Sequence, residues 1–552
     1  MSLAFLSGIM TSATSGMRAA QAQLDIVSRN VSNAGTAGYT RKEVPLQTII
    51  GDGAAFGVTT AEVRRSVSQS LLQELRTGNS TAAALQVAED YLGRLELAFG
   101  APGDGSSIAT TLGNIGDSFR NLASEPNSAT LQQQTLLRAG NFASAVNALS
   151  ETIQSFRTDA DASIANTVGF FNSTLSQINE VNRSITQLRG LGRSAADLED
   201  RRDALLKDLS ELIDIRTFER SSGEIVVTTR SGRELLDAAV GQLSFNPNPV
   251  ISPDMAYSDG DLSGVLLDGV DISSELGGGK LRGLLDIRDR TMVDAQARLD
   301  ELTARVAQNM ALCDLDLFSY GSIRNVVTSA TAASTLAKGG TTLSVSSAAG
   351  LAVGMNLRFA NHPTTYAVTA IAGTNVTIAP ASGATTGVDV EIPTGTRMVF
   401  AEQPGTARVG FSRTVAVNPA VTAAPWRLRD GTSAASIGSL AQNNTIARAI
   451  VDSFERVQPF SPSGGQGGSL TLTAYAGSLI VAQSTARAGA KESLEARERL
   501  NEQFEQRFSS ESAVNVDREL ALMMEIQNSY AASAKVMQAA RELMDALLST
   551  VR

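Results

Sequence analysis

The sequence predicts a multidomain α+β fold: long terminal α-helices that form a coiled coil, a discontinuous helical bundle domain, and inserted all-β modules. Three observations predict it. Apolar residues alternate at spacings of three and four at both ends of the chain, helical spacing recurs between them, and two central stretches are β-prone with glycine-rich turns. This nested order requires that segments far apart in the sequence meet at the base of the molecule.

The two ends of the chain each carry a heptad seam. The N-terminal seam is entirely apolar and consists of Leu3, Leu6, Met10, Ala13, Met17, Ala20, Leu24, Val27 and Val31. The C-terminal seam has only two polar members, Gln527 and Arg541, and consists of Leu520, Met523, Gln527, Tyr530, Ala534, Met537, Arg541, Met544, Leu548 and Val551. A helix of roughly 30 residues is about 45 Å long, and either stripe alone would face water. We therefore expect the two seams to pair.

Length and composition restrict the classes of protein. A chain of 552 residues is long enough for about three or four domains. A hydrophobic content of 43% with 18% charged residues is typical of a folded protein. The formal net charge of −10 lacks the basic footprint that nucleic-acid binding requires. No stretch reaches about 18 consecutive apolar residues, so no membrane span is expected, and without a basic n-region no cleaved signal peptide is expected.

The sequence offers little chemistry. One cysteine, Cys313, excludes an intrachain disulfide and a cysteine-based metal site, and one histidine, His362, excludes a two-histidine metal site. We expect Cys313 in a core and His362 in a loop or at a strand edge. Gly277 to Gly279 and Lys280 do not form a phosphate loop, because Leu281 stands where a hydroxyl should coordinate Mg²⁺. No catalytic, cofactor-binding or metal-binding residue is predicted, and we expect no enzyme.

Changes in pattern divide the chain into four predicted domains. Residues 1–65 and 510–552 form a terminal helical polymerisation domain, with a β arm after the first helix. Residues 66–213, 277–324 and 429–509 form the discontinuous bundle, and 214–276 a small β unit. Residues 325–428 form an inserted all-β outer domain with very few charges, and strands are expected at 342–345, 355–359, 366–371, 376–378 and 388–392.

A short motif follows the first helix. It consists of Asn30, Val31, Ser32 and Asn33, followed by Thr36, Gly38, Tyr39, Thr40 and Arg41. This motif resembles the Asn-x-x-Asn, Thr-x-Gly-Tyr-Ser/Thr-Arg signature of the flagellar axial proteins of bacteria. Rod and hook members typically lack the Thr-Arg pair, so Thr40 and Arg41 favour the hook-associated members that join hook to filament. Locally, each residue also suits a helix stop and a turn.

Further collinear stretches resemble the same family. They are Asp197 to Ser210, Gly283 to Leu285 with Arg288, Val415 to Leu428, and Val514 to Asp517 followed by Gln527, Tyr530, Ala534 and Val536. Together they are spread over about three quarters of the length, whereas no stretch of residues 325–400 is identified as similar to the family. The resemblance implies export through the flagellar secretion channel without a cleaved signal. It also implies assembly as a layer between hook and filament, with the terminal helices in the innermost tube.

The implied partners are other copies of this chain, the hook protein, a second junction protein that leads to the filament, and an export chaperone on the C-terminal helix. A second apolar stripe, Val536, Ala540, Leu543 and Leu547, gives that helix two apolar sides, which suits polymerisation because each neighbour buries more of it. The predicted subunit-interface residues are Leu3, Leu6, Met10, Met17, Leu24, Val27, Val31, Leu520, Met523, Tyr530, Met537, Met544 and Leu548.

Three alternatives stay open at this point. Another hook or rod component is the first. The second is a wall-cutting hydrolase, which would need two carboxylates about 5 to 9.5 Å apart, whereas Asp314 and Asp316 are expected to point apart on a helix. The third is a binding module for glycans or host surfaces within residues 325–400, although threonine-rich faces are also ordinary for a β surface.

Overall fold

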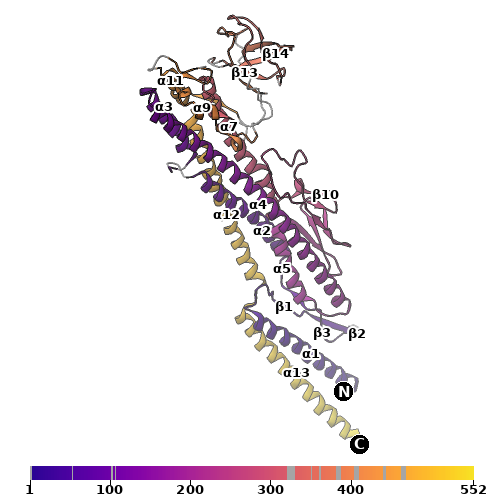
Figure 1. Cartoon of the computed structure of the whole chain (residues 1–552). Coiled ribbons are helices and arrows are strands. Elements are labelled where there is room, and N and C mark those ends of the chain that lie inside the picture. The colour runs from indigo at the N-terminus through magenta and orange to yellow at the C-terminus, as the bar shows by residue number, and fades with distance from the viewer. Residues whose placement is uncertain are drawn as a thin grey trace.

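The computed structural model describes residues 3–51, 54–100, 104–105, 107–319, 330–349, 351–359, 362, 364–380, 387–402, 409–434, 436–438, 443–461 and 468–551. It leaves out the side chains of 3–7, 51, 54–55, 399–402 and 547–551. The molecule is elongated, with a pair of terminal helices at one end, a helical body in the middle and a β module at the other end (Figure 1).

The terminal region combines both ends of the chain. Helices α1 (Leu3–Asn33) and α13 (Val516–Val551) run antiparallel, so that the start of α1 and the end of α13 lie together. Strands β2 (Leu46–Gly51) and β3 (Ala54–Thr60) form the predicted arm, an antiparallel hairpin that packs on α1. The short strands β1 (Lys42–Glu43) and β4 (Arg64–Arg65) pair where the arm begins and ends.

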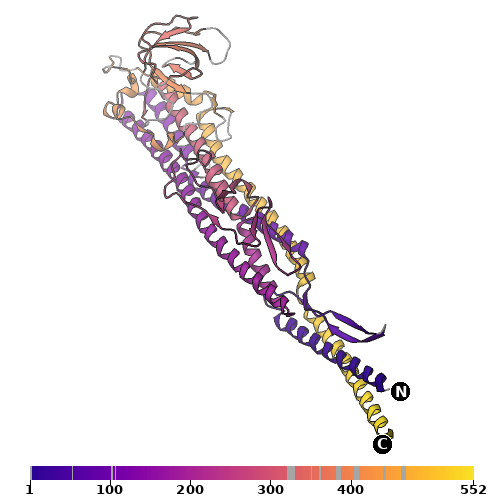
Figure 2. The same ribbon diagram turned by 90° about the vertical axis from the view of Figure 1, so that its right-hand side faces the viewer.

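The body is a bundle of long helices (Figure 2). Its elements are α2 (Gln69–Phe99), α3 (Ile108–Ser124), α4 (Ala129–Gly190), α5 (Ala196–Leu212), α6 (Gly279–Asp286), α7 (Met292–Leu312), α11 (Thr445–Glu455) and α12 (Leu472–Ser512). Helix α4 is a single helix of 62 residues. Within the bundle segment predicted over 277–324, a π-helical turn, η2 (Ile287–Thr291), separates α6 from α7, and α7 ends at Leu312.

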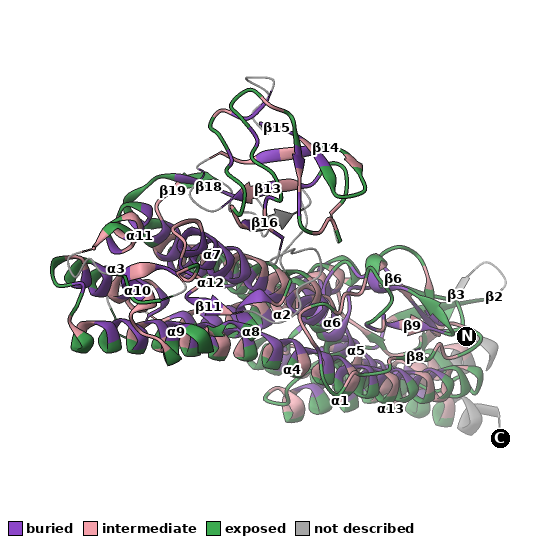
Figure 3. Ribbon diagram, turned by 45° about the horizontal axis from the view of Figure 1, so that its top comes forward, coloured by how far each residue is buried: buried purple, intermediate pink, exposed green. Residues whose placement is uncertain are grey.

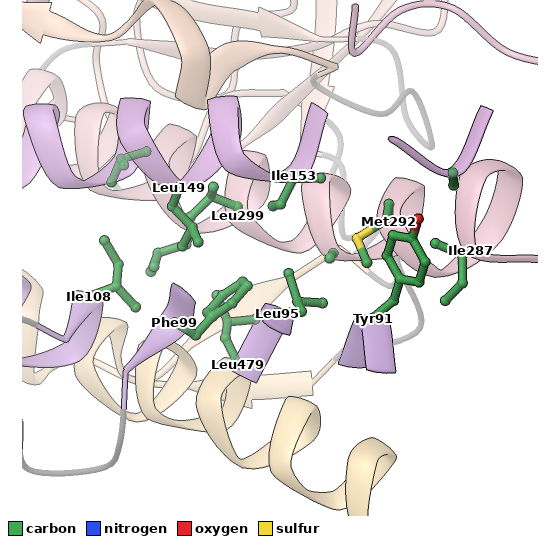
Figure 4. Close-up of a cluster of buried hydrophobic side chains, with 14 of the residues drawn as sticks. Tyr91, Leu95, Phe99, Ile108, Leu149, Ile153, Ile287, Met292, Leu299 and Leu479 are labelled. Carbon is green, nitrogen blue, oxygen red and sulfur yellow. The ribbon is translucent and has the colours of Figure 1, made fainter. Parts of the chain in front are cut away.

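One continuous apolar core fills the body. Side chains from α2, α3, α4, α7 and α12 meet inside it, including Leu95, Ile108, Leu149, Leu299 and Leu479 (Figure 4). Buried residues follow the inward faces of these helices (Figure 3). The core is mainly aliphatic, as the low aromatic content predicts.

The β unit between α5 and α6 lies on this same core. It contains two three-stranded antiparallel sheets, β5 (Ile215–Glu219), β6 (Ile225–Thr229) and β7 (Glu234–Leu236) in the first, and β8 (Leu243–Ser244), β9 (Leu266–Leu267) and β10 (Val270–Asp271) in the second. A 3₁₀ turn, η1 (Ser273–Glu275), leads to the three glycines. Gly279 has a φ of 84°, and a Cβ there would lie 2.4 Å from the Leu212 carbonyl oxygen. The triple glycine therefore allows close backbone contact between α6 and the end of α5.

The outer β module has a core of its own. Its five strands are β12 (Thr342–Ser344), β13 (Asn356–Phe359), β14 (Tyr366–Ala372), β15 (Asn375–Pro380) and β16 (Met398–Glu402), in the spatial order β12-β15-β14-β13-β16. Four of the expected strands are present. The fifth expectation, 388–392, is wrong: Val388 and Ile392 are buried in the module core, but only Ile392 makes a bridge, to Leu336, and β16 takes the edge position.

The predicted outer domain, 325–428, extends too far along the chain. Residues after 409 form α8 (Phe411–Thr414), β17 (Ala416–Val417), α9 (Pro419–Ala423) and α10 (Arg427–Asp430), and their apolar side chains join the body core. Buried Asp300 of α7 fixes this segment, because its Oδ1 accepts hydrogen bonds from the Ser412 N–H at 2.8 Å and Oγ at 2.6 Å. Strand β11 (Phe318–Ser319) pairs with β17, and β18 (Gln458–Phe460) pairs with β19 (Gly468–Leu470).

The residues that were weighed above as metal-binding or catalytic candidates are held in packing contacts, hydrogen bonds or ion pairs. Cys313 caps the end of α7 and is half-buried, and burial raises the pKa of its thiol to about 11. His362 is buried in the loop after β13, beside the Phe359 ring. The sequence predicts Asp314 and Asp316 on a helix. This prediction is wrong, because α7 ends at Leu312 and both residues follow it. Asp314 accepts a hydrogen bond from Ser433, and Asp316 pairs with Arg397.

Candidate assembly site and its joint

The contact between α1 and α13 is narrow. Its buried centre consists of Ala20, Val27 and Ile526, with Leu24, Leu522 and Met523 packed around it. Further along, a Cβ at Gly16 would lie 3.2 Å from the Ser533 Oγ, so the helices approach closely where this glycine sits. Small residues in the seam bring the backbones together but bury little apolar area.

The C-terminal seam keeps some of its predicted members and replaces others with the preceding residue. Leu520, Gln527 and Arg541 are exposed, and the buried positions are one residue earlier, at Glu519, Ile526 and Ala540. Met523, Met537 and Met544 are half-buried, as the predicted seam requires, whereas Tyr530 is exposed. Both polar members of the predicted seam thus face away from α1. The buried Glu519 carboxylate, which binds Asn30 and Arg41, sets this register.

The predicted residues of α1 lie toward its partners. Ala13, Ala20 and Val27 are buried, and four others, Met10, Met17, Leu24 and Val31, are half-buried. Met10 lies beside the arm, in a cavity that Ile49 and Val58 also line. The side chains of Leu3, Leu6, Leu547, Leu548 and Val551 lie outside the described residues.

Apolar side chains remain exposed around this narrow contact. On α13, Leu520 is 43% exposed, Met524 61%, Val536 48% and Leu543 49%. On the arm, Ile50 is 73% exposed, and Leu46, Ile49 and Phe56 are also exposed. One partner helix therefore leaves apolar faces on both sides of the pair in water. Large exposed apolar patches of this kind mark interaction sites.

Asn30 is the fully buried residue at the top of α1, where the pair meets the body. Its Nδ2 donates to the Lys42 carbonyl oxygen at 2.9 Å and to Glu519 Oε2 at 3.0 Å. Its Oδ1 accepts from the Tyr39 hydroxyl at 3.0 Å and from the Lys42 N–H at 3.1 Å. One amide thus ties the end of α1, the chain that leaves it and the start of α13 together.

The middle of the motif forms the turn that brings the chain back. Gly38 has a φ of 78°, a conformation that favours glycine. The Asn33 Nδ2 donates to the Arg29 carbonyl oxygen, and the Asn33 carbonyl oxygen accepts from the Thr36 N–H at 2.9 Å. These local roles agree with the helix stop that the residue types predict.

Arg41 joins three elements. Its backbone N–H donates to the Ser512 carbonyl oxygen at the end of α12 at 2.8 Å, and its carbonyl oxygen accepts from the Ser66 N–H at 2.9 Å. Its Nε donates to Glu519 Oε1 at 2.6 Å. Burial lowers the pKa of Arg41, but the hydrogen bonds and charges of Glu519 and Glu43 together outweigh this, and the net shift is upward.

Asp200 of α5 makes the central contact between the body and the segment at the end of the motif. Four donors reach its carboxylate: the Thr40 Oγ1 at 2.5 Å and N–H at 3.3 Å, the Lys42 Nζ at 3.0 Å and the Arg65 Nη1 at 3.1 Å. Asp197, one turn earlier, binds Lys42 Nζ at 2.6 Å. Burial lowers the pKa of Lys42, but the hydrogen bonds of Asp197 and Asp200 give it a net upward shift.

Arg65 of β4 extends the network along α5. It binds Glu199 at 2.9 Å and Asp203 at 2.7 Å, in addition to Asp200. Burial lowers the pKa of this guanidinium, and the three carboxylates more than compensate. Asp203 also binds Arg76 of α2 at 2.8 Å. Three stretches with separate family resemblance, near 30–41, 197–210 and 514–536, therefore meet at one polar joint.

Sequence reasoning missed the importance of Glu519 and the pairing of Asp200 with Lys42. A weak signal existed for Glu519, since an acid in the first turn of a helix suits the helix dipole. Spacing cannot reveal a contact between residues 30 and 519.

Among the described residues, no cluster of His, Cys, Asp or Glu could hold a metal ion. The described helices include none with the length and hydropathy needed to cross a membrane.

Family models match three parts of the chain. One described as the helical domain of the flagellar hook-associated protein FlgK matches residues 92–312. A model described as flagella basal body rod protein matches residues 10–40, and one described as the C-terminal part of the flagellar basal body rod FlgEFG proteins matches residues 505–550. The terminal matches cover α1 from residue 10 onward, its motif as far as Thr40, and nearly all of α13.

Relatives and a solved structure extend the likeness to the whole chain. Flagellar hook-associated protein 1 of Escherichia coli strain K12 is 24% identical over 574 aligned positions, which cover 99% of this chain and 100% of that protein. The protein of the same name from Bacillus subtilis strain 168 is 27% identical and covers 41% of this chain and 48% of its own length. The flagellar hook junction protein FlgK from Burkholderia pseudomallei has a similar fold, with a TM-score of 0.50 and 16% identity over 79% of this chain and 99% of that one. The chain is thus similar to flagellar hook-associated protein 1 over nearly its whole length.

Proposed function

We propose that this protein is a structural component of the bacterial flagellum, an adaptor layer that joins hook to filament by polymerisation through its terminal helices. The observation that carries the proposal is the exposed apolar surface on both sides of the α1–α13 pair, which includes Leu543 and Ile50. Neighbouring copies would remove this surface from water, at about 25 cal/mol per Å² of apolar area. An alternative role in the rod is not favoured, because the helical domain of a hook-associated protein matches residues 92–312.

The assembly domain consists of residues 1–65 and 510–552. Its faces differ: the arm covers one side of α1, and α13 covers another (Figure 1). Contacts between unlike faces are heterologous, so addition can continue around a layer. The partners are further copies of this chain, the hook protein on one side and a second junction protein on the other.

Export precedes assembly in this proposal. The chain leaves the cell through the flagellar secretion system without a cleaved signal, and an export chaperone covers α13 beforehand. The exposed residues of α13, such as Met524 and Val536, support such a cover. If a chain without residues 510–552 bound the chaperone as tightly as the full chain, this part would be wrong. We expect no enzymatic activity.

Deletion of residues 1–40 or 510–552 tests the function coarsely. We expect hooks without filaments, with filament protein shed into the medium, when cells are imaged by electron microscopy. Normal filaments would contradict the proposal.

A point variant separates assembly from export and folding. Leu543→Asp places a charge on the exposed face of α13, which is 49% exposed, without touching the centre of the α1 contact. We expect secretion at the level of the natural chain but loss of filaments. Asn528→Asp adds the same charge at another exposed position of α13 and should leave filaments intact. If the Leu543→Asp and Asn528→Asp strains had equal numbers of filaments, the face of α13 that carries Leu543 would not be part of the interface.

A further inference from the structure

A cavity of about 370 Å³ lies where the outer β module meets the body. The module contributes Arg358 of β13 and His362 in the loop after it to the walls. The body contributes Asn309 of α7, Arg456 at the end of α11 and Gln458 of β18. Figure 3 shows β13 and β18 near each other, above α7. The volume lies within the range of about 300–1,000 Å³ that is usual for small-molecule sites.

Two buried polar atoms at this cavity lack a hydrogen-bond partner in the described part of the chain. They are the Nδ1 of His362, a residue that is 7% exposed, and the Nε2 of Gln458, which is 9% exposed. Buried polar groups are normally hydrogen-bonded, and leaving them unsatisfied destabilises a protein. The amide Nε2 only donates, and the imidazole Nδ1 donates when it carries a proton. The group that would satisfy both atoms is therefore an acceptor.

The charges around the cavity favour an anion. Arg358 and Arg456 supply two guanidinium groups, and none of the described lining residues is acidic. Asp452, one helical turn before Arg456, is exposed and does not line the cavity. Asp389, whose charge acts on His362, already accepts hydrogen bonds from two hydroxyl groups of the module. The fork of an arginine side chain matches the oxygens of a carboxylate or a phosphate.

We propose that this cavity binds a small organic anion through a carboxylate or phosphate group, which Arg456, Gln458 and His362 hold together. The half-buried Leu312 and the exposed Val457 also line the cavity and offer apolar contact to the carbon part of the ligand. The ligand touches the outer module and the body at once. Its binding depends neither on the terminal helices nor on assembly.

Nuclear magnetic resonance tests the site directly, because His362 is the only histidine of the chain. The full chain with isotope-labelled histidine is titrated with sulfate, methyl phosphate or propionate at constant ionic strength, with chloride as the reference. We expect a saturable shift of the imidazole signal with at least one of these oxyanions. We also expect a higher pKa of His362 in its presence, since a nearby negative charge favours the protonated ring.

The tighter binder of methyl phosphate and propionate shows whether the ligand group is a phosphate or a carboxylate. If none of the three oxyanions shifted the signal more than chloride does, the proposal would be wrong.

An arginine variant shows whether the anion binds in the cavity. Arg456→Gln removes a cation at an exposed position and should weaken binding about threefold or more. The matched control, Arg448→Gln, removes the same charge from an exposed position of α11 that does not line the cavity, and should bind like the natural chain. Equal affinities in the two variants would overturn the proposal.

A second variant distinguishes a ligand-binding role of Gln458 from a structural one. In Gln458→Leu, an apolar group replaces the unpartnered amide, so the Tm without ligand should be unchanged or higher. The affinity for the anion should fall about tenfold, as expected for loss of a hydrogen bond to a charged group. A lower Tm with undiminished affinity would show that Gln458 serves the fold alone, and would contradict the proposal.

Discussion

Helices α1 and α2 have the same length, 31 residues, but opposite surroundings. The buried side chains of α2 include Leu75, Leu95 and Phe99, and the helix contacts α12, α6 and α5. The buried apolar side chains of α1 are mostly alanines, and the helix that it packs against most extensively, in the part of the chain that the structure describes, is α13. A buried CH₂ group contributes about 0.8 kcal/mol, so α2 gains far more from the fold of one chain than α1 does.

The difference separates a helix that is stabilised within its own chain from one that keeps exposed apolar surface, as the proposed assembly requires. The body has one continuous core that fixes its helices without outside help. The terminal pair has a small cluster, small residues where the helices approach and exposed apolar flanks. Most helical stability in proteins comes from packing of the apolar face, and here part of that face stays exposed in the single chain.

The largest expected effect is on the body core. Phe119 of α3 is fully buried, and Phe119→Ala should lower the free energy of unfolding of the body by about 3–5 kcal/mol, since it leaves a cavity. Chemical denaturation followed by circular dichroism measures this. An unchanged midpoint would mean that the body core is not the cooperative unit.

The second largest expected effect is on the triple glycine, Gly277 to Gly279. Gly279→Ala places a Cβ at 2.4 Å from the Leu212 carbonyl oxygen at a φ of 84°, so the variant should lose at least about 1–3 kcal/mol of stability. Gly169 of α4 has open space around its Cα, and Gly169→Ala should gain up to about 1 kcal/mol in the same assay. If both variants lost stability, crowding within the helices would explain the result, and the backbone contact at Gly279 would not.

The terminal pair should respond locally. Val27→Ala removes two buried CH₂ groups, worth about 1–2 kcal/mol, and should speed hydrogen exchange in α1 and α13 about tenfold. The Tm of the body should not change, because its core contains no residue of the pair. The exposed Gln21→Ala serves as the control and should alter neither quantity. A lower Tm of the body would join the two regions into one folding unit.

The smallest expected effect is on the pH dependence of the joint. The pKa values of Lys42 and Tyr39 are both raised, from ordinary values of 10.5 and 10.0. Their contribution to docking is therefore present below those ordinary values and is lost as pH rises through the raised pKa values. Distances between spin labels at Gln21 of α1 and Gln187 of α4, both exposed, should broaden in strongly alkaline solution, and Lys42→Met should reduce that dependence. A natural chain whose distances stay unchanged would show that these groups do not hold the joint.

The sequence predicted the elements well wherever local pattern decides them. The β arm after the first helix and the helical bundle that begins near residue 66 follow from the period of the apolar residues. The register of α13 could not be read in this way. By residue type, apolar Leu520 suits a heptad position and charged Glu519 does not. Only the buried contacts of Glu519 with Asn30 and Arg41 select the observed face.

For the assembly site too, local features could be predicted from the sequence and contacts between distant residues could not. By itself, the sequence determined that both ends are amphipathic helices and that a helix stop with a Gly38 turn follows the first, because spacing and backbone preference are local properties. Only the tertiary structure decided that Asn30, Asp200 and Glu519 meet, that α13 turns Gln527 and Arg541 outward, and that the pair and the body keep separate cores. Those outcomes depend on contacts between residues that are hundreds of positions apart, and no local pattern encodes such contacts.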